Sequence, residues 1–547
     1  MTDLEGRTTD IGTLFSQESF FRIPEYQRPF SWEDDNFEDL IDDILAADPS
    51  QEYFLGTLVL QKIDTKGNYE VVDGQQRLTS LMILLACLRD RLADTQYSDA
   101  IQDKILQKEN VVDGIPQKVR LEVKDRKIFT EVVVTKGGTT KKRREKDLPE
   151  PEWRYVQAVN IFNERLSSLN ENDLQKTSTF VSQKCVVIHL ATSTFDDAFR
   201  LFTIVNDRGK QLRRIDVLKS INIAPDILSS QAVRNRIAQK WEELETDVGE
   251  AAFESIFHLI RLIMLKDKPQ GDLLKEFENR VFTKGLVSKG EPFVDLVFGY
   301  VDVYKRVFGD RDILLEDDSN HIRFRELIHI MISHFKASEW KACLLFFTKK
   351  FHGEKVYEFC LEIEKVYLAQ WVQGVRKDER YSAYAKILGS IETSKSAEAV
   401  VKGITYDDTV IEKAVTNPNI YGAGYCKYFL LRLELLATEH DVVKEFNAKS
   451  IEHVLPQTPD SASNWASIHD LSEINEYVNS IGNLVLLSKS RNSSASNYDF
   501  EIKKDKYLRT RVTDYPRSVE VLKYDRWDKA TITERTEQAK GMFLSDP

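Results

Sequence analysis

The longest strongly apolar run of this chain, Leu78 to Leu88, is short and lies between two arginines, Arg77 and Arg89. A membrane span needs about 20 apolar residues, so the run predicts a helix buried inside a folded domain, and we expect no membrane partner. The N-terminus lacks the basic start and apolar core of a secretory signal, which indicates a cytoplasmic protein. At 547 residues the chain is too long for one hydrophobic core, and three domains are expected.

Cysteine usage and net charge narrow the functional classes. The five cysteines are widely spaced, odd in number and without a Cys-x-x-Cys pair, which argues against a disulfide framework and against structural zinc. The formal net charge is -12, so the chain as a whole does not favour nucleic acid. Any contact with DNA must therefore be local, where lysines and arginines cluster.

Residues 1–220 alternate short strands and helices. Trp32 to Ala47 has the 3-4 spacing of an amphipathic helix, Tyr53 to Lys62 and Tyr69 to Asp73 predict a strand pair, and a helix follows from Gln75. Residues 113–150 are predicted to be an irregular insertion. Its basic piece, Lys136 to Lys146, is either a solvated loop tip or an arm that contacts phosphates.

The rest of the chain has a different pattern. The spacing of apolar residues predicts helices over most of residues 221–440, and residues 441–547 are expected to form a separate domain. There, Ser450 to Leu455 and Ile481 to Ser488 predict two strands, and Asn497 to Leu508 predicts a helix. The expected fold class is a multidomain α+β protein with an α/β N-terminal domain, an all-helical middle and a C-terminal β-β-α unit, with boundaries at residues 220 and 440.

The C-terminal part carries a set of residues suited to phosphodiester hydrolysis. That reaction needs a base to deprotonate water and a cation to stabilise the leaving oxygen. His453 can be the base, with Glu452 as a hard oxygen ligand beside it. Asn492, or alternatively Asn497, can supply a second oxygen to Mg²⁺ or Mn²⁺, while Asn483 ties the loops together or orients the imidazole. The open alternative is a structural histidine on a strand, followed by a turn.

A local basic surface accompanies these residues. The segment from Lys489 to Arg511 has seven positive and three negative side chains, a net charge of +4. A phosphate backbone could lie on it. The candidate DNA contacts are Lys489, Arg491, Lys503 and Lys504.

The second candidate site is N-terminal, where a strand ending at Asp73-Gly74 passes directly into a helix. The free backbone N–H groups at that helix start form an anion site, with Arg28 and Arg77 as phosphate partners. Tyr26 or Trp32 can stack on a base. The alternative is that the residues after Gly74, the two glutamines and Arg77, only cap and brace the turn.

Both regions resemble known families. Glu-His-Val-Leu-Pro-Gln from Glu452, Ile-Gly-Asn-Leu-Val-Leu-Leu from Ile481, and Arg-Asn-x-x-x-x-Asn from Arg491 with a following Lys-Lys resemble the HNH (His-Me finger) nuclease domain DUF1524. The resemblance covers residues 441 to 515. It implies a ββα-metal fold with His453 as general base, Glu452 and Asn492 as metal ligands, and Asn483 as a supporting residue.

The N-terminal motifs resemble DUF262, a ParB-like α/β domain. They are Tyr-Gln-Arg-x-aromatic-x-Trp from Tyr26, Phe-Leu-Gly from Phe54, Val-Asp-Gly-Gln-Gln-Arg-Leu-Thr from Val72, and a later motif within Phe202 to Lys219. The resemblance implies binding or hydrolysis of a nucleoside triphosphate, which could be GTP, ATP, CTP or UTP, without a P-loop. The residues implied are Tyr26, Gln27, Arg28, Trp32, Asp73, Gly74, Gln75, Gln76, Arg77, Asn206, Arg208 and Lys219.

The order of the two domains is similar to that of GmrSD-type, type IV restriction enzymes. The resemblance implies an anti-phage endonuclease for modified double-stranded DNA, in which the N-terminal domain controls metal-dependent cleavage around His453, and a possible homodimer. Three alternatives stay open: a phosphorothioate-sensing NTPase and nickase of the SspE kind, a nucleotide-dependent DNA-binding switch that does not cleave, and an RNA-directed toxin.

Overall fold

The computed structural model describes residues 4–16, 19–24, 27, 29–93, 95–144, 148–194, 197–198, 201, 213–224, 227–311, 313, 318–440, 442–446, 450–487, 498–505 and 515–545. The chain divides into two compact units, Met1–Ala238 and Gln239–Pro547. The helical region and the C-terminal strands share the second unit, and the division into three domains at residues 220 and 440 stays a prediction.

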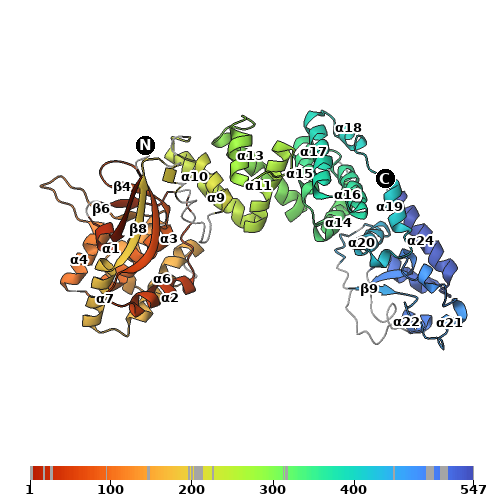
Figure 1. Cartoon of the computed structure of the whole chain (residues 1–547), viewed down its shortest axis with the longest axis horizontal. Coiled ribbons are helices and arrows are strands. Elements are labelled where there is room, and N and C mark those ends of the chain that lie inside the picture. The colour runs from red at the N-terminus through yellow and green to blue at the C-terminus, as the bar shows by residue number, and fades with distance from the viewer. Residues whose placement is uncertain are drawn as a thin grey trace. The chain divides into compact units, whose positions relative to one another are not determined.

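The first unit is an α/β structure around a mixed sheet of six strands (Figure 1), which confirms the predicted class of this region. Its elements are β1 (Glu5–Asp10), α1 (Ile11–Leu14), β2 (Phe20–Arg22), α2 (Asp34–Ala46), β3 (Tyr53–Lys62), β4 (Asn68–Asp73), α3 (Gln75–Arg91), α4 (Gln96–Ile105), β5 (Leu106–Gln107), β6 (Lys118–Val119), β7 (Leu121–Glu122), α5 (Arg126–Phe129), η1 (Thr130–Val134), η2 (Gly138–Thr140), α6 (Glu150–Leu166), α7 (Glu171–Gln183), β8 (Cys185–Thr192) and α9 (Arg214–Asn222). Helix α10 (Gln231–Val248) crosses the boundary between the units.

The sheet brings several strand ends to one edge. Its order is β1-β8-β3-β4-β2-β7. Strand β2 is parallel to both β4 and β7, with Arg22 opposite Glu70 and Glu122. The carboxyl ends of these three strands therefore lie at the same edge, the side on which open α/β sheets bind ligands.

Helix α3 is the centre of the core, as the apolar run predicts. Every residue from Leu78 to Arg89 is buried, and the helix packs against α4, α6 and α7. Gly74, the residue directly before the helix, has a φ of 95°. A Cβ there would lie 2.3 Å from Cδ2 of Leu58, so both the backbone angle and the close packing require glycine.

The predicted irregular insertion was wrong for its larger part. Residues 118–140 form β6, β7, α5, η1 and η2, and Val132, Val133 and Val134 are buried in the core. The carboxylate of Asp90 at the end of α3 anchors the segment by accepting hydrogen bonds from the backbone N of Gly137 (2.9 Å) and the hydroxyl of Thr139 (2.7 Å). The prediction failed because short apolar pieces of this segment pack against α3. That helix is too distant in the sequence for a local pattern to show the contact.

The second unit begins with a helical region, as predicted. It comprises α11 (Glu250–Leu265), α12 (Leu273–Glu276), η5 (Phe277–Phe282), α13 (Glu291–Tyr304), η6 (Lys305–Gly309), α14 (Asp318–His334), α15 (Glu339–Phe351), α16 (Val356–Gln373), α17 (Lys377–Thr393), α18 (Ala397–Lys402), α19 (Asp408–Val415), η7 (Ile420–Gly422) and α20 (Cys426–Leu436). Its core is rich in aromatic pairs, such as Trp241 with Phe253 and Phe335 stacked on Tyr367.

A small α+β region follows in the same unit. It comprises β9 (Ser450–His453), α21 (Trp465–Ile468), η8 (Ile474–Glu476), η9 (Ile481–Asn483), β10 (Leu484–Leu487), α22 (Phe500–Lys503), α23 (Pro516–Glu520), η12 (Val521–Lys523) and α24 (Lys529–Leu544). The two predicted strands pair antiparallel. The ends of the predicted helix from Asn497 to Leu508 lie outside the described residues, and the ββα-metal fold stays a prediction.

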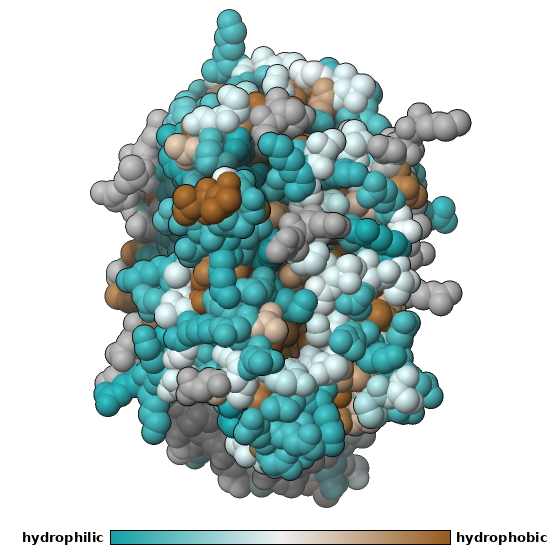
Figure 2. Space-filling view, turned by 90° about the vertical axis from the view of Figure 1, so that its left-hand side faces the viewer, coloured by the Kyte–Doolittle hydropathy of each residue, from teal (hydrophilic) through white to brown (hydrophobic). Residues whose placement is uncertain are grey.

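The surface and the cysteines are unremarkable for a globular protein. All five cysteines are free and buried. The coloured residues of the face in Figure 2 are mostly hydrophilic, with hydrophobic residues scattered among them. In the part of the chain that the structure describes, no helix is both long enough and apolar enough to cross a membrane.

Candidate functional site

Strand pairing places the candidate base at the end of a strand. His453 is the last residue of β9 and lies opposite Leu484 of β10, with Glu452 opposite Val485. After β9, both backbone groups of Leu455 form hydrogen bonds with the side chain of Asn483, which lies directly before β10. The imidazole of His453 is mostly buried, with 8% of the residue exposed.

The hydrogen bonds of His453 define its tautomer. Nε2 lies 2.9 Å from Oδ1 of Asn479. The same oxygen accepts a hydrogen bond from Nε2 of Gln457 at 2.8 Å, which identifies it as an acceptor. Nε2 of the neutral imidazole therefore carries the proton, and Nδ1 keeps the lone pair that a general base needs.

The surroundings of His453 also keep it neutral. Burial lowers the pKa of His453, the hydrogen bond to Asn479 opposes this shift, and the positive charge of Lys503 adds to it. Because an ordinary histidine has a pKa of about 6.5, a lowered value leaves the imidazole unprotonated at neutral pH.

A tyrosine from η7 packs against the same imidazole. The ring centroids of Tyr421 and His453 are 4.4 Å apart with the planes inclined at 67°. The backbone N of Tyr421 donates to the carbonyl oxygen of Asn479 at 3.2 Å. The His453 ring is thus held between a residue of the helical region and a residue of the loop before β10.

Asn483 ties the loops together. Its Oδ1 accepts from the backbone N of Leu455 (2.8 Å) and from Nε1 of Trp527 (2.9 Å), and its Nδ2 donates to the carbonyl oxygens of Leu455 (2.9 Å) and Val478 (2.7 Å). These four bonds use the full capacity of the carboxamide. The side chain is fully buried, so its contacts support the loops that carry His453 and Asn479.

Glu452 is bound to a lysine in the described part of the site. Nζ of Lys503 lies 3.3 Å from Oε1 of Glu452 and donates to the carbonyl oxygen of His453 at 2.7 Å. Within the described residues there is no group of three or more His, Cys, Asp or Glu side chains that could hold a metal ion. Glu452 supplies one hard oxygen beside His453, and its predicted co-ligand, Asn492, lies outside the described residues, as does Asn497.

The two described lysines of the predicted DNA surface have internal partners. Lys503 and Lys504 are each 4% exposed. The ammonium of Lys504 donates to the carbonyl oxygen of Tyr524 at 3.0 Å and lies over the ring of Phe500. In this arrangement both ammonium groups bind within the domain, and their contact with DNA stays a prediction. The other two predicted contacts, Lys489 and Arg491, lie outside the described residues.

In the first unit, two glutamines of the predicted sensing motif hold the segment before α2. Nε2 of Gln27 donates to the carbonyl oxygen of Val72 at 2.8 Å. Gln76 accepts from the backbone N of Ser31 (2.9 Å) and Trp32 (3.2 Å) through Oε1, and its Nε2 donates to the carbonyl oxygen of Pro29 at 3.0 Å. The two motifs are therefore adjacent at the edge where β2 and β4 end, and these glutamines brace them.

Arg77 lies over a glycine of β3. Its Nη1 donates to the carbonyl oxygen of Thr57 at 3.2 Å, and a Cβ on Gly56, whose φ is 113°, would lie 2.8 Å from the guanidinium carbon. Burial lowers the pKa of Arg77, and the charge of Asp73 opposes this shift. Asp73, Gly74 and Gln75 form the junction of β4 and α3.

The remaining predicted residues divide between described and undescribed positions. Lys219 lies in α9 and is buried. Tyr26, Arg28, Asn206 and Arg208 lie outside the described residues. The structure thus brings Gln27, Trp32, Asp73 and Arg77 to one edge of the sheet.

Sequence reasoning missed two neighbours of His453, namely Asn479 and Tyr421. Asn479 stands four positions before Asn483. In the sequence it is one polar residue of a loop, and no pattern marks it as a partner of His453. Tyr421 lies in the helical part, 32 positions before His453, and no local pattern connects the two.

Comparison with known protein families gives two matches. Residues 11–223 match the model of the GmrSD restriction endonuclease N-terminal domain, and residues 405–539 match that of the GmrSD restriction endonucleases C-terminal domain. The second match begins before η7 and includes Tyr421 as well as His453. Among curated proteins no match was found. The two matches cover more than half of the chain in the order of the family, and the chain therefore belongs to the GmrSD type IV restriction endonuclease family.

Proposed function

We propose that this restriction nuclease hydrolyses phosphodiester bonds of modified DNA at His453, in a reaction that depends on a divalent metal ion and is regulated by a nucleoside triphosphate. Membership of the family implies a nuclease that binds DNA. The observation that carries the choice of site is the hydrogen bond from Nε2 of His453 to Asn479, which leaves Nδ1 as the basic nitrogen.

The chemistry follows from that tautomer. Nδ1 of His453 takes a proton from a water molecule, and the resulting hydroxide attacks phosphorus in line with the leaving 3′ oxygen. The positive charge that develops on the imidazole is shared through the bond to Asn479, since Nε2 donates to a carboxamide oxygen. The lowered pKa of His453 keeps the base available at neutral pH.

The donor set beside His453 agrees with a hard cation. Glu452 offers a carboxylate oxygen, which Mg²⁺ and Mn²⁺ prefer. A divalent ion, when bound, would stabilise the charge on the leaving oxygen. Nζ of Lys503 lies 3.3 Å from the Glu452 carboxylate. A divalent ion bound to Glu452 would repel this ammonium, so metal binding would require Lys503 to move away.

For the nucleotide, the proposal rests on the junction of β4 and α3. Helix α3 begins at Gln75 directly after Gly74, so its first N–H groups point out of the edge where β2, β4 and β7 end. Arg77 lies in this first turn with a neutral carbonyl partner, Thr57, and keeps its positive charge.

One experiment tests the cleavage proposal. The full-length protein is incubated with unmodified, glucosylated hydroxymethylcytosine and phosphorothioate DNA, with Mg²⁺ and with or without each nucleotide, beside His453→Ala. We expect cleavage of one modified substrate that needs Mg²⁺ and is abolished in His453→Ala. Equal cleavage by the variant would remove His453 as the base. Cleavage of only the phosphorothioate substrate would place the chain with the SspE kind of enzyme.

A further inference from the structure

The first unit contains a segment in which positive charge is concentrated. Residues 126–144 carry seven basic side chains and one acidic side chain, Glu131, a net charge of +6 in a chain whose formal net charge is -12. For the basic piece of this segment, the sequence leaves two alternatives open, a solvated loop tip or an arm that contacts phosphates. The contacts of the basic side chains favour the second alternative.

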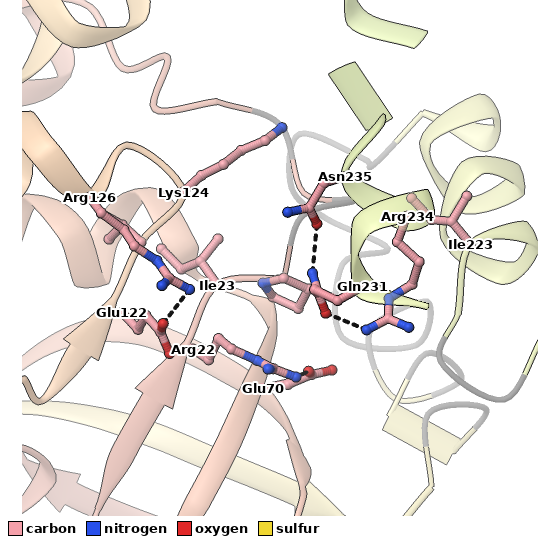
Figure 3. Close-up of a pocket in the computed structure, with 12 residues that line it drawn as sticks. Arg22, Ile23, Glu70, Glu122, Lys124, Arg126, Ile223, Gln231, Arg234 and Asn235 are labelled. Atoms are coloured by element: carbon pink, nitrogen blue, oxygen red, sulfur yellow. Dashed lines mark hydrogen bonds and ion pairs between the residues drawn. The ribbon is translucent and has the colours of Figure 1, made fainter. Parts of the chain in front are cut away.

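Two of the seven cations have carboxylate partners. Figure 3 shows the guanidinium of Arg126 bound to the carboxylate of Glu122 at the sheet edge. Nζ of Lys136 lies 2.7 Å from Oδ1 of Asp99 in α4. The charges of these two side chains are therefore compensated locally, and they do not enter the inference.

The backbone before the remaining cations is anchored in the core. Asp90 at the end of α3 accepts hydrogen bonds from the backbone N (3.0 Å) and the hydroxyl (2.7 Å) of Thr139. Nδ2 of Asn163 in α6 donates to the carbonyl oxygen of Thr139 at 3.1 Å. Gly138 is buried, and a Cβ on it would lie 2.4 Å from the carbonyl oxygen of Glu131. The backbone that leads into the basic residues is thus held in place, unlike that of a solvated loop tip.

Arg143 fastens the basic residues to this turn. Its Nη1 donates to the carbonyl oxygen of Gly138 at 3.0 Å, and its guanidinium lies 3.4 Å from the carbonyl oxygens of Lys141 and Glu131. All of these acceptors are neutral, so the guanidinium keeps its charge. Arg143 therefore positions its neighbours in the chain without lowering the positive charge of the segment.

The neighbours of Arg143 are exposed and uncompensated. Lys141, Lys142 and Arg144 are all exposed. Among the residues that the structure describes, none is an ion-pair or hydrogen-bond partner of these three side chains. Four consecutive residues span about 10 Å at most, and duplex DNA carries about one negative charge per 1.7 Å of its axis. The three cations can therefore contact more than one phosphate at the same time.

The composition of the segment suits a phosphate backbone better than a protein surface. Residues 135–144 consist only of Thr, Lys, Gly and Arg. Protein interfaces depend on apolar and aromatic residues at their centre, and none is present here. Phosphates are bound by lysine, arginine and hydroxyl groups. An anchored backbone also loses little conformational freedom on binding.

We propose that residues 141–144, here called the basic turn, bind the phosphate backbone of DNA through Lys141, Lys142 and Arg144. The inference rests on the proposed function, because it takes DNA as the partner, and it adds a place in the first unit where the DNA is held. Phosphate contacts carry no sequence information. The basic turn therefore increases the affinity for modified and unmodified DNA by the same factor, and other residues must recognise the modification.

The test measures binding of the full-length protein to labelled duplex DNA by fluorescence anisotropy, with EDTA in place of Mg²⁺ so that no bond is cleaved. Salt is varied from about 50 to 200 mM. In Lys141→Gln/Lys142→Gln we expect the slope of log affinity against log salt to become shallower by about 2, since each phosphate contact contributes about 0.9. Affinity at the lowest salt should fall about tenfold or more. The factor should be the same for unmodified, glucosylated hydroxymethylcytosine and phosphorothioate DNA.

Two further variants serve as controls. Lys66→Gln/Lys176→Gln removes the same charge from exposed positions of the first unit, and Lys141→Arg/Lys142→Arg keeps the charge of the basic turn; both should keep the wild-type slope. An unchanged slope in Lys141→Gln/Lys142→Gln, or an equal change in the Lys66 and Lys176 control, would overturn the proposal. A change seen with duplex RNA and not with DNA would assign the basic turn to RNA and overturn it as well. A wild-type protein that binds no DNA would also refute the DNA part of the proposed function, whereas the His453→Ala result bears only on cleavage.

Discussion

At the scale of single residues, the imidazole of His453 is fixed from three directions. The strand sets its backbone, Asn479 sets its tautomer, and the ring of Tyr421 limits its rotation. A base that is oriented before substrate arrives does not lose conformational freedom during the reaction. Asn479 is therefore a positioning residue for the proposed base. The pH dependence of the cleavage rate distinguishes this role from a purely structural one.

Two substitutions at Asn479 should move the pH profile in a predictable way. In Asn479→Ala the acceptor for Nε2 is lost, and we expect kcat to fall by roughly tenfold or more, within the range that base catalysis contributes. In Asn479→Asp the acceptor stays and a negative charge is added, which raises the pKa of His453. The acidic limb of the kcat profile should then move to higher pH than in wild type, because protonated His453 cannot act as base.

The measurement is the rate of DNA cleavage from about pH 5 to pH 9, around the ordinary histidine pKa of about 6.5, with saturating DNA and Mg²⁺. Gln457→Ala, which removes the other donor to Asn479, is the matched control and should keep the limb near its wild-type position. A profile that is the same in Asn479→Asp and wild type would show that His453 is not the titrating base.

Asn483 should affect stability more than chemistry. In Asn483→Ala the indole of Trp527 and the backbone N of Leu455 lose their acceptor in a buried place. Each unsatisfied group costs about 1–3 kcal/mol, so the melting temperature of the second unit should fall clearly. Asn464→Ala, at an exposed position, serves as the control and should stay within about 0.5 kcal/mol of wild type. Calorimetry decides, and an unchanged transition in Asn483→Ala would contradict the loop-bracing role.

At the scale of elements, a buried carboxylate joins the helical region to the strands of the site. Glu434 of α20 accepts from the backbone N of Arg517 at 2.7 Å, and its other carboxyl oxygen lies 3.1 Å from the hydroxyl oxygen of Ser518. Ser518 in turn bonds both backbone groups of Leu486 in β10. Helix α20, helix α23 and β10 are thus connected through one polar cluster.

This cluster predicts a pH dependence of stability. Burial raises the pKa of Glu434 to about 7, whereas an unfolded glutamate has a pKa of about 4.3. Between these values the folded state binds more protons than the unfolded state, so stability falls as pH rises. Glu434→Gln removes the titrating group and keeps an acceptor for Arg517, while its amide can donate to Ser518.

We therefore expect Glu434→Gln to match wild type near pH 4.5 and to exceed its stability above pH 7, by up to about 3 kcal/mol. The measurement is the melting temperature across this pH range. Glu439→Gln, outside the cluster, is a charge-matched control. A parallel decrease of wild type and Glu434→Gln between pH 5 and pH 7 would assign the titration to other groups.

Elements with a local signal could be predicted from sequence. The helix α3, the β3-β4 pair and the β9-β10 pair each follow from hydrophobic spacing and from turn residues such as Gly74. The order of the six strands could not be predicted, because parallel pairs such as β3 with β8 join residues more than 100 positions apart. The residues around His453 were found only in part for the same reason, since Tyr421 and Asn479 reach it through tertiary contacts.

At the scale of the whole molecule, the proposed chemistry and its proposed control lie in different units. His453 belongs to Gln239–Pro547, and the turn at Gly74 belongs to Met1–Ala238. Control of cleavage by a nucleotide therefore requires that binding in the first unit changes an equilibrium of the second unit. A ligand can shift such an equilibrium only by its difference in affinity for the two states.

The two functions should consequently be separable by mutation. In His453→Ala we expect loss of DNA cleavage with the affinity for nucleotide unchanged, because the side chains that hold this residue, Asn479, Lys503 and Tyr421, belong to the second unit. In Arg77→Gln we expect the reverse: the effect of nucleotide on the cleavage rate should be reduced or lost, while the metal-dependent cleavage seen without nucleotide stays. Arg91→Gln is a control for the loss of an arginine from the same helix. Arg91 lies at the other end of α3, where its guanidinium donates to Asn163 of α6. Calorimetry measures the nucleotide and a gel assay the cleavage, both on full-length protein whose melting temperature has been checked. Loss of nucleotide binding in His453→Ala would show that the two sites depend on each other for folding, and an unaltered nucleotide response in Arg77→Gln would make the bracing of β3 its only role.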